Sequence, residues 1–410
     1  MQTHLSPEFA DTSDGKEAQA IIRKCVHCGF CNATCPTYQL LGDELDGPRG
    51  RIYLMKQVLE GAEVTRSTQQ HLDRCLTCLN CQTTCPSGVE YGHLVDIGRK
   101  IVEARVERPA AQRAVRWLLK EGLTSPLFAP AMRLGQAVRP LLPAVFRNKV
   151  PRRTAARAAA GPARAHPRKV LMLRGCVQPA MMPNIDRAAA RVLDAAGIQT
   201  VHADATGCCG AVRTHLGDHA GGLDDMRRNI DAWMPMVSAG ECAAIVASAS
   251  ACSLAIKDYG HALAADAVYA DKAARISALA RDLSELLPEL TPALTGRMRR
   301  EGLPRLAFHA PCTLQHGQRL NGVIETHLRA LGFDVSAAVR ESHLCCGSAG
   351  TYSILQPDLA TQLRDRKLAN LAALDAQCII SANVGCIQHL QSGTLTAVKH
   401  WVEVLDEALG

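Results

Sequence analysis

The sequence predicts a mixed α/β protein, in which a mainly α-helical amino-terminal domain precedes two copies of an α/β unit built on parallel sheets. Three observations support this prediction. A twelve-residue cysteine pattern occurs twice near the amino terminus. Apolar residues then recur every three or four positions, as in amphipathic helices. Beyond a basic segment, short apolar runs alternate with helix-length segments, which is the rhythm of parallel strands joined by crossover helices.

Composition is typical of a globular protein from a reducing compartment. Its 410 residues suffice for two or three domains, and 47% of them are hydrophobic. The opening MQTHLSPEFADTSDGKEA lacks the apolar core of a secretory signal, and no run of about 18 apolar residues predicts a transmembrane segment. We therefore expect a cytoplasmic protein, whose 18 cysteines are better explained as metal ligands than as disulfides.

The net charge of +7 is concentrated in one segment. Eight Lys and Arg and no acidic residue lie between Arg147 and Lys169, so the rest of the chain carries −1 (+7 minus +8). This distribution argues against a nucleic-acid partner. Because the segment is also rich in Ala and Pro, we expect a solvated basic linker over residues 126–169; a docking strip for an acidic subunit or anionic lipid is the alternative.

Upstream of the linker, residues 1–125 are expected to form the helical domain. The patterns RIYLMKQVLEG, HLVDIGRKIVEARVE and AAQRAVRWLLKEGL predict helices at 51–61, 93–107 and 110–123. Gly61 and Gly122 stand where helix ends favour glycine.

Downstream of the linker, four short apolar runs predict strands. They are KVLMLRG at 169–175, CAAIVASAS at 242–250, RLAFHA at 305–310 and CIISAN at 378–383. Helix-length segments such as IDRAAARVLDAAG lie between them, so the strands are expected to be parallel and covered by helices.

This downstream half also repeats internally. Cys176, Cys208-Cys209-Gly210 and Cys252 recur as Cys312, Cys345-Cys346-Gly347 and Cys386, at offsets of 136, 137 and 134 residues. Three features displaced by nearly one constant indicate two copies of one unit, which we expect at residues 170–300 and 301–410.

The repeated amino-terminal block reads CVHCGFCNATCP from Cys25 and CLTCLNCQTTCP from Cys75. It has the form CxxCxxCxxxCP, the ligand run of bacterial two-cluster ferredoxins. Three thiolates of each run surround one face of an iron-sulfur cube, and the fourth cysteine serves the other cluster. The pattern therefore predicts two [4Fe-4S] clusters, one held by Cys25, Cys28, Cys31 and Cys85, the other by Cys75, Cys78, Cys81 and Cys35.

Zinc is the alternative occupant, but zinc motifs usually place two CxxC pairs on either side of a longer loop. Covalent haem is excluded because no CxxC is followed by histidine. His27, inside the first loop, is expected to face solvent. Two neighbouring clusters predict one-electron transfer. No dinucleotide fingerprint and no set of nucleophile, base and oxyanion donors is evident, so no catalytic residue is expected in this chain.

Each downstream copy contains four cysteines, enough for a further cluster or a redox site. They are Cys176, Cys208, Cys209 and Cys252, then Cys312, Cys345, Cys346 and Cys386. The alternative is that these thiols stabilise loops at the carboxyl ends of strands, where open α/β sheets also place their binding crevices. The residues alone leave both readings open. Cys242 and Cys378, which open predicted strands, are expected to be small buried apolar residues.

Together these motifs resemble the ferredoxin-plus-CCG proteins and, more narrowly, the iron-sulfur subunits of glycolate oxidase, also called glycolate dehydrogenase. The narrower resemblance covers nearly the whole chain. It rests on CVHCGFCNATCPTYQLLGDELDGPRGRIYLMKQVLEG, LDRCLTCLNCQTTCPSGVEYG, HAPCTLQHGQRLNG, HLCCGSAGTYS and HWVEVLDEALG. The segment from Arg133 to Lys169 matches least, and SASACS lacks the glycine that the family commonly places before the cysteine corresponding to Cys252.

The resemblance implies an electron-transfer subunit of an oxidoreductase complex. FAD-binding subunits would oxidise glycolate to glyoxylate, and this chain would pass the electrons singly to a quinone or another acceptor. A peripheral position on the inner face of the cell membrane would come through the complex. Two alternatives remain: a subunit of a lactate-utilisation or heterodisulfide-reductase-type complex with the CCG cysteines as its redox site, and a purely structural metal protein.

Overall fold

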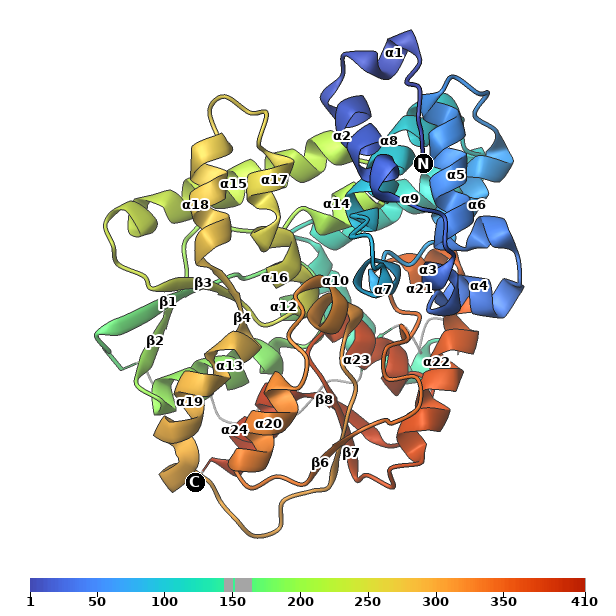
Figure 1. The fold of residues 1–410 in the computed structure, drawn as a ribbon. Helices are drawn as coiled ribbons and strands as arrows, with labels where there is room; N and C mark the ends of the chain where they lie inside the picture. The colour runs from blue at the N-terminus through green and yellow to red at the C-terminus, as the bar shows by residue number, and fades with distance from the viewer. Residues whose placement is uncertain (144–149, 152–163, 410) are drawn as a thin grey trace.

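The computed structural model describes residues 1–143, 150–151 and 164–409, which form three packed parts (Figure 1). A helical amino-terminal domain, blue in Figure 1, lies against two α/β units coloured green to yellow and orange to red. The predicted fold class, a helical domain followed by two repeated units with parallel sheets, is confirmed. The most basic part of the predicted linker lies largely outside the described residues.

The amino-terminal domain consists of short helices joined by loops. The helices are α1 (Pro7–Ala10), α2 (Ser13–Lys24), α3 (Phe30–Ala33), α4 (Pro36–Leu41), η1 (Glu44–Asp46), α5 (Pro48–Leu59), α6 (Arg66–Asp73), α7 (Asn80–Thr84), α8 (Tyr91–Arg105) and α9 (Ala110–Thr124). The three predicted helices are α5, α8 and α9. They form because each has one apolar face, and the faces of α5 and α8 pack into a common core with α2.

The two glycines expected at helix ends behave differently. Gly61 has a φ of +94° directly beyond the end of α5, a left-handed conformation that glycine adopts without a Cβ clash. For Gly122 the prediction was wrong, because α9 continues to Thr124. Pro126 is what ends the helix: it forces Ser125 into an extended conformation, with φ −70° and ψ 143°.

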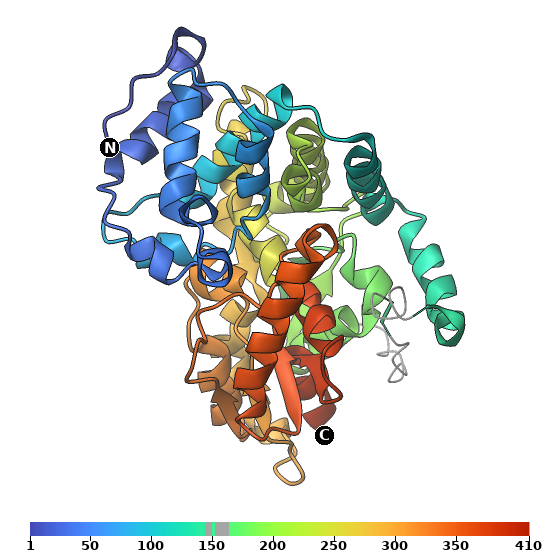
Figure 2. The same cartoon turned by 90° about the vertical axis from the view of Figure 1, so that its right-hand side faces the viewer.

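Two elements follow inside the predicted linker, α10 (Phe128–Ala137) and η2 (Arg139–Leu141). No residue of α9 or α10 is buried in the described structure, and Figure 2 shows both helices at the edge of the molecule. The apolar side chains of Leu127, Leu134, Val138 and Leu141 are spaced for one helical face and are all exposed. This part of the linker is therefore helical, with an apolar stripe turned to solvent.

The first α/β unit begins with β1. Its elements are β1 (Arg168–Met172), α12 (Gln178–Met181), α13 (Pro183–Ala195), β2 (Ile198–Val201), α14 (Ala211–His215), α15 (His219–Ser238), β3 (Ala244–Ala247), α16 (Ser250–Lys257), α17 (Tyr259–Ala262), α18 (Ala270–Leu279), β4 (Ala280–Asp282), η3 (Leu283–Leu286), α19 (Leu287–Leu294) and η4 (Thr295–Arg297).

The second unit follows the same plan. Its elements are β5 (Leu306–Phe308), the π turn η5 (Thr313–Gly317), α20 (Val323–Ala330), β6 (Val335–Ala337), α21 (Tyr352–Leu355), α22 (Pro357–Ala372), β7 (Cys378–Ser381), α23 (Val384–Gln391), β8 (Ala397–His400) and α24 (Trp401–Ala408).

Both sheets are parallel and have one topology, with strand orders β2-β1-β3-β4 and β6-β5-β7-β8. The central strands β1, β3, β5 and β7 are the four predicted ones, each shorter than its apolar run. All residues of β3, β5 and β7 and the last three of β1 are buried, as parallel strands covered by helices must be. The outer strands, of three or four residues each, carry too short a pattern to be predicted.

The two units share one hydrophobic core. Residues of β1, α13 and α19 from the first unit belong to the same buried cluster as β5, β7 and α24 from the second. The carboxyl-terminal helix α24 packs on α13, where Asp406 accepts two hydrogen bonds from Arg191 at 2.7 and 2.6 Å. Backbone pairing of Met298 with Leu409 closes the same seam. The units are thus joined by apolar packing as well as by the chain.

None of the helices in the described part of the chain combines the length and the hydropathy that crossing a bilayer requires.

The shared core predicts that the two units unfold together. Trp401 is fully buried at the start of α24, so Trp401→Ala should lower the free energy of unfolding by about 3–5 kcal/mol. Hydrogen exchange should then accelerate in β1 as much as in β5. The control is Lys399→Ala, which removes an exposed pair with Glu407 and should change stability by less than about 0.5 kcal/mol. Accelerated exchange in β5 alone would contradict the shared core.

Candidate iron-sulfur sites

Both cysteine loops have the same backbone conformation at two positions. Two residues of each loop are left-handed: His27 (φ +60°) and Gly29 (φ +85°) in the first, Thr77 (φ +50°) and Leu79 (φ +61°) in the second. The two left-handed residues turn the chain sharply after each of the first two cysteines, so the sulfurs face one centre. Only one of the four is glycine, so the loops hold conformations that side chains normally avoid and that the surrounding contacts must stabilise.

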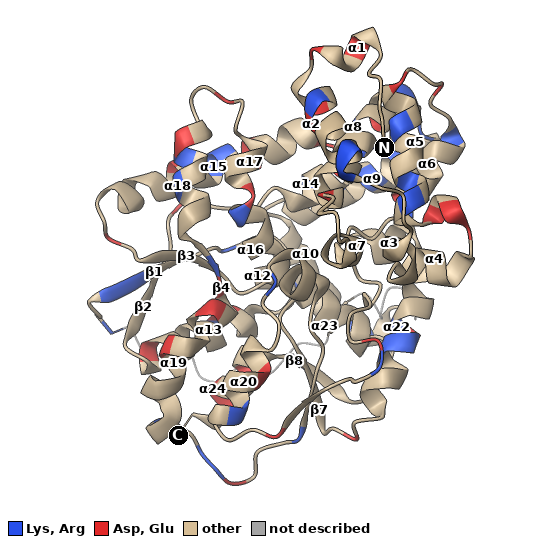
Figure 3. Ribbon diagram, in the orientation of Figure 1, with Lys and Arg blue, Asp and Glu red and all other residues tan. Residues whose placement is uncertain are grey.

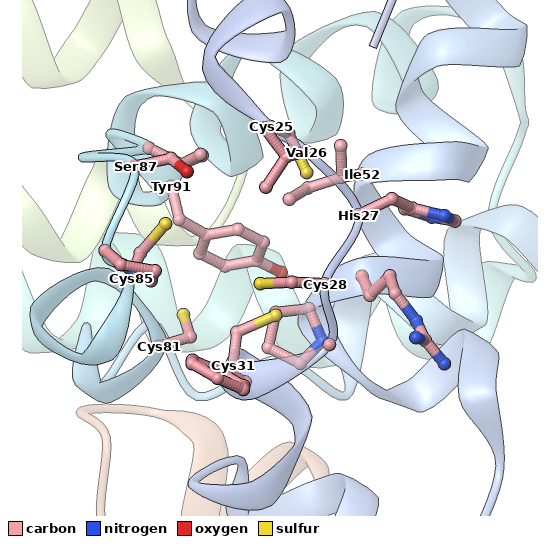
Figure 4. Close-up of a pocket in the computed structure, with 16 residues that line it drawn as sticks. Cys25, Val26, His27, Cys28, Cys31, Ile52, Cys81, Cys85, Ser87 and Tyr91 are labelled. Carbon is pink, nitrogen blue, oxygen red and sulfur yellow. The ribbon is translucent and has the colours of Figure 1, made fainter.

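The first site lies between the helical domain's two cysteine runs. One pocket is lined by Cys25, Cys28, Cys31 and Cys85, together with Ile52 and Tyr91 among others. Figure 4 shows the sulfurs of these cysteines, and that of Cys81, turned toward a common space, while the ring of His27 points away from it. His27 is exposed, as predicted. Cys85 comes from the second run, so the first site needs both runs.

The second site adjoins the first. A separate pocket is lined by Cys35, Cys75, Cys78 and Cys81. Cys35 belongs to the first run and is held as the N-cap of α4, because Pro36 begins that helix without needing a backbone N–H partner. Cys81 and Tyr91 line both pockets.

The structure brings the eight predicted cysteines to two adjoining pockets, each lined by the four cysteines predicted for one cluster, with Cys81 lining the first pocket as well. The donor set fits iron-sulfur clusters, since at least four thiols line each pocket and all 18 cysteines of the chain are free of disulfides. The assignment of individual ligands stays a prediction.

Burial determines the protonation of these thiols. Burial, and then the neighbouring Cys25, raises the pKa of Cys31 to about 11, and burial also raises the pKa of Cys81. Cysteine binds metals as the thiolate. Cluster binding therefore has to displace protons from buried thiols and leaves negative charge that nearby cations must offset.

Arg51 is the buried cation beside the second site, and the sequence analysis missed it. Its side chain is only 1% exposed, and its Nε donates to the backbone oxygen of His71 at 2.7 Å. Both terminal nitrogens donate to the Thr37 hydroxyl at 3.2 Å, and that hydroxyl lies 3.3 Å from the Cys35 sulfur. The one available signal was an arginine on the apolar face of a predicted helix.

Asp46 holds this cation in place. Its carboxylate is fully buried and accepts from Arg51 at 3.5 Å, from Arg74 at 2.8 Å and from His71 at 3.0 Å. Two guanidinium groups and one carboxylate leave a net positive charge against the second pocket. Such outer contacts orient metal ligands and set the charge that the site accommodates.

The eight downstream cysteines lie at the carboxyl ends of the strands. This is the position expected if the thiols stabilise the loops there. In the first unit, Cys176 follows β1, Cys208 and Cys209 follow β2, and Cys252 lies in α16 after β3. In the second unit, Cys312 follows β5, Cys345 and Cys346 follow β6, and Cys386 lies in α23 after β7.

In each set, neighbouring thiols lie close enough to shift one another's pKa, so the four cysteines form a row. The rows run Cys176, Cys208, Cys209, Cys252 and Cys312, Cys345, Cys346, Cys386. In the first row, hydrogen bonds from Cys176 and Cys209 lower the pKa of Cys208. In the second, the Cys312 hydrogen bond lowers the pKa of Cys345, but Cys346 and burial outweigh it and raise that pKa to about 12.

The second row is continuous with the iron-sulfur pockets. Cys78, a cysteine of the second pocket, packs against the buried cluster that contains Cys312 and Cys345, and Cys345 and then Cys78 raise the pKa of Cys312. Lys367, 3% exposed, donates to the backbone oxygens of Glu341 at 2.6 Å and Ser342 at 3.3 Å, just before the paired cysteines. The residue 137 positions earlier, in the first unit, is the buried Ile230.

The remaining two cysteines, Cys378 and Cys242, differ in burial. Cys378 is buried as the first residue of β7, as predicted. Cys242 contradicts its prediction, because it is only partly buried and lies two residues before β3. The apolar run that suggested a longer strand begins in the loop after α15, where the chain still approaches the sheet from the surface.

Family models match both halves of this architecture. Residues 21–89 match the model described as a 4Fe-4S dicluster domain. Residues 170–257 and 306–391 each match the model of the cysteine-rich domain named CCG.

Similar proteins extend the comparison to the whole chain. The glycolate oxidase iron-sulfur subunit of Escherichia coli (strain K12) is 53% identical over 410 residues, covering 100% of this chain and 99% of that protein. The probable glycolate oxidase iron-sulfur subunit of Bacillus subtilis (strain 168) is 28% identical, with 99% and 97% covered. Lactate utilization protein A of Geobacillus thermodenitrificans (strain NG80-2) is 25% identical and matches 58% of this chain and 98% of its own length.

Fold and sites together define an iron-sulfur protein that joins a dicluster domain to two cysteine-rich domains. Within that class, the chain belongs to the family of glycolate oxidase iron-sulfur subunits.

The position of Arg51 predicts a selective effect on the second site. Arg51→Met removes a buried positive charge and part of the support of Asp46, so the reduction potential of the second cluster should fall and the domain should lose about 3–5 kcal/mol of stability. Redox titration followed by electron paramagnetic resonance measures the potentials. Arg113→Met, on the exposed α9, is the matched control and should leave both potentials unchanged. An equal shift of both clusters in Arg51→Met would contradict this assignment.

Proposed function

We propose that this chain is the electron-transfer subunit of a glycolate dehydrogenase complex. FAD-binding subunits of the complex oxidise glycolate to glyoxylate, and this chain passes the electrons one at a time toward a quinone or another acceptor. The observation that supports the proposal best is the full-length similarity to a glycolate oxidase iron-sulfur subunit, together with two adjoining pockets that the eight amino-terminal cysteines line. The substrate site belongs, on this proposal, to the FAD-binding partner.

The chain's own residues have defined tasks in this proposal. Cys25, Cys28, Cys31 and Cys85 hold one [4Fe-4S] cluster, and Cys75, Cys78, Cys81 and Cys35 hold the other. When bound, each cluster supplies a one-electron carrier. Tyr91 separates the two pockets and keeps water from them, while its hydroxyl lies 3.7 Å from the Cys75 sulfur.

The second CCG unit continues the proposed path of the electrons beyond the two cluster sites. Its four cysteines form either a further cluster site or the redox site that a heterodisulfide-reductase-type complex uses. Three observations favour the second unit over the first: the Cys312–Cys78 contact, the buried Lys367, and Gly385 before Cys386 where the first unit has Ala251. We place the domain boundaries at residues 1–125, 126–169, 170–300 and 301–410, with α24 of the last unit completing the core of the preceding one.

A peripheral position at the inner face of the cell membrane fits the surface of α9 and α10. The exposed apolar stripe along α10 and η2 lies in a stretch, residues 110–169, that contains thirteen Lys or Arg and a single acidic residue, Glu121. Apolar helical faces flanked by positive charge suit anionic surfaces. The stripe is equally suited to an acidic subunit of the complex.

The interleaved ligands predict which variants share a phenotype. Cys85→Ser should lose the same cluster as Cys28→Ser, although the two residues belong to different runs, and Cys35→Ser should match Cys78→Ser. Each variant should fall from about eight irons per chain to about four, as measured by iron and labile-sulfide analysis. About twelve irons in the unchanged chain would add a cluster in a CCG unit. A Cys85→Ser variant that matches Cys78→Ser instead would show that each run holds its own cluster.

The proposed activity is tested on the purified complex. Glycolate should reduce the clusters, seen as a paramagnetic signal at low temperature, only when the FAD-binding subunits are present. Transfer to a quinone analogue should then need this chain. If the FAD-binding subunits alone reduce the acceptor at the rate of the full complex, the proposal is wrong. Faster cluster reduction by lactate than by glycolate would favour the lactate-utilisation alternative.

A further inference from the structure

The two cysteine loops have the same sequence spacing but opposite surroundings. Corresponding residues lie 50 positions apart, so Val26 corresponds to Leu76 and Phe30 to Asn80. Val26 is 69% exposed and Leu76 only 7%, while Phe30 is 62% exposed and Asn80 only 2%. The backbone conformation is common to both loops, so the difference comes from what covers them.

The second loop is covered by the second CCG unit. Leu76 packs in a small apolar cluster with Tyr352, Leu359 and Leu363. Asn80 donates to the backbone oxygen of His343 at 3.2 Å, and the Tyr352 hydroxyl donates to the backbone oxygen of Arg74 at 3.1 Å. In this copy, therefore, the outer surface of the cysteine loop is a docking surface for another redox-type domain.

The same surface of the first loop has no cover within the described chain. We call it the entry rim: Val26, Phe30 and Tyr53, which are exposed like the nearby Cys28 of the first pocket. Val26 and Phe30 line the mouth of the first pocket, and the ring of Tyr53, 44% exposed, lies 6.5 Å from that of His27. Three large exposed apolar side chains around one redox site are the composition of an interface core.

Charge at the entry rim is low. Helices α3 and α4 carry no charged residue, as their uniform tan colour in Figure 3 shows. Arg49, which lines the first pocket, is paired with Glu44 at 2.6 Å, and Lys24, beside Cys25, is paired with Glu90 at 2.5 Å. A bilayer or a nucleic acid would call for unpaired positive charge here, whereas a protein partner with an apolar patch would not.

We propose that the entry rim is the docking surface of the FAD-binding subunit, and that electrons enter this chain at the first site. The proposal rests on the function proposed above. Its structural basis is the asymmetry of the repeat: the second site is enclosed by the second CCG unit, so the first site is where a predicted cluster ligand meets solvent beside an apolar rim.

The oxidation of glycolate releases two electrons, so the contact at the entry rim has to serve two successive one-electron transfers. Oxidation of one glycolate gives two electrons and two protons to the flavin of the partner. The reduced flavin then releases its electrons in two single transfers at the entry rim, and its protons leave to solvent. Each electron moves on to the second site before the next arrives, and the acceptor takes both. A transient contact of modest area suits such repeated transfer.

The test compares Val26→Ser and Phe30→Ser with Leu395→Ser, which alters a fully exposed leucine of the second unit far from both pockets. The rim variants should bind the FAD-binding subunit with a Kd raised about tenfold or more, because exposed apolar residues at an interface centre carry much of its affinity. Leu395→Ser should bind like the unchanged chain. Reduction by glycolate through the FAD-binding subunit should slow in the rim variants, while reduction by dithionite, which needs no docking, should not.

The outcomes separate this inference from the function on which it rests. Unaltered iron content and paramagnetic signals in the rim variants show that the sites remain intact. Equal binding by the rim variants and the unchanged chain would overturn the docking surface alone. A change of oligomeric state in the rim variants would overturn it too, because the rim would then bind a second copy of this chain. Failure of the FAD-binding subunit to bind even the unchanged chain would overturn the proposed function itself.

Discussion

The structure depends on holding eight thiol groups in two adjoining pockets, where their ionised forms would repel one another. Burial raises the pKa of Cys31 and Cys81, so the chain alone favours the neutral thiols. The compensating charge is built into the surrounding helices, with Arg51 and Arg74 fixed against the second pocket by Asp46. The backbone helps as well, because left-handed residues in each loop aim the sulfurs inward before any metal binds.

Interleaving gives this arrangement its rigidity. Both pockets are lined by cysteines from both runs, so neither lining is complete unless both runs are in place. The helices α5 and α8 pack between the runs and supply the apolar walls, including Tyr91. A domain this small gains stability from such cross-links, much as other small metal-binding domains do.

The CCG units contribute a second kind of asymmetry. Their sheets and cysteine rows are nearly the same. In the second unit, however, Cys312 meets Cys78 of the iron-sulfur pockets, and the buried Lys367 stands where the first unit has Ile230. The shared core fixes the two units relative to each other, and the second unit in turn covers the second cysteine loop. The two cysteine loops, although similar in sequence, therefore differ in exposure: the first is open to solvent and the second is enclosed.

The sequence by itself determined the features that depend on local spacing. The three predicted helices of the amino-terminal domain and the four central strands follow from patterns within a few residues, and the duplication of the CCG unit follows from the repeated cysteine spacing; the structure bears them out. Short edge strands, the end of α9 and the partial exposure of Cys242 were missed or misplaced, because neighbours distant in sequence decide them.

Tertiary structure alone decided which surfaces are covered. Val26 and Leu76 occupy the same place in the same motif, and nothing in either loop foretells that one is exposed and the other packed against Tyr352. Likewise, the sequence presents Arg51 as an ordinary helical arginine, and only the folded structure shows its contacts with Asp46 and Thr37. Burial and charge compensation are properties of contacts between distant segments, and a spacing pattern does not record them.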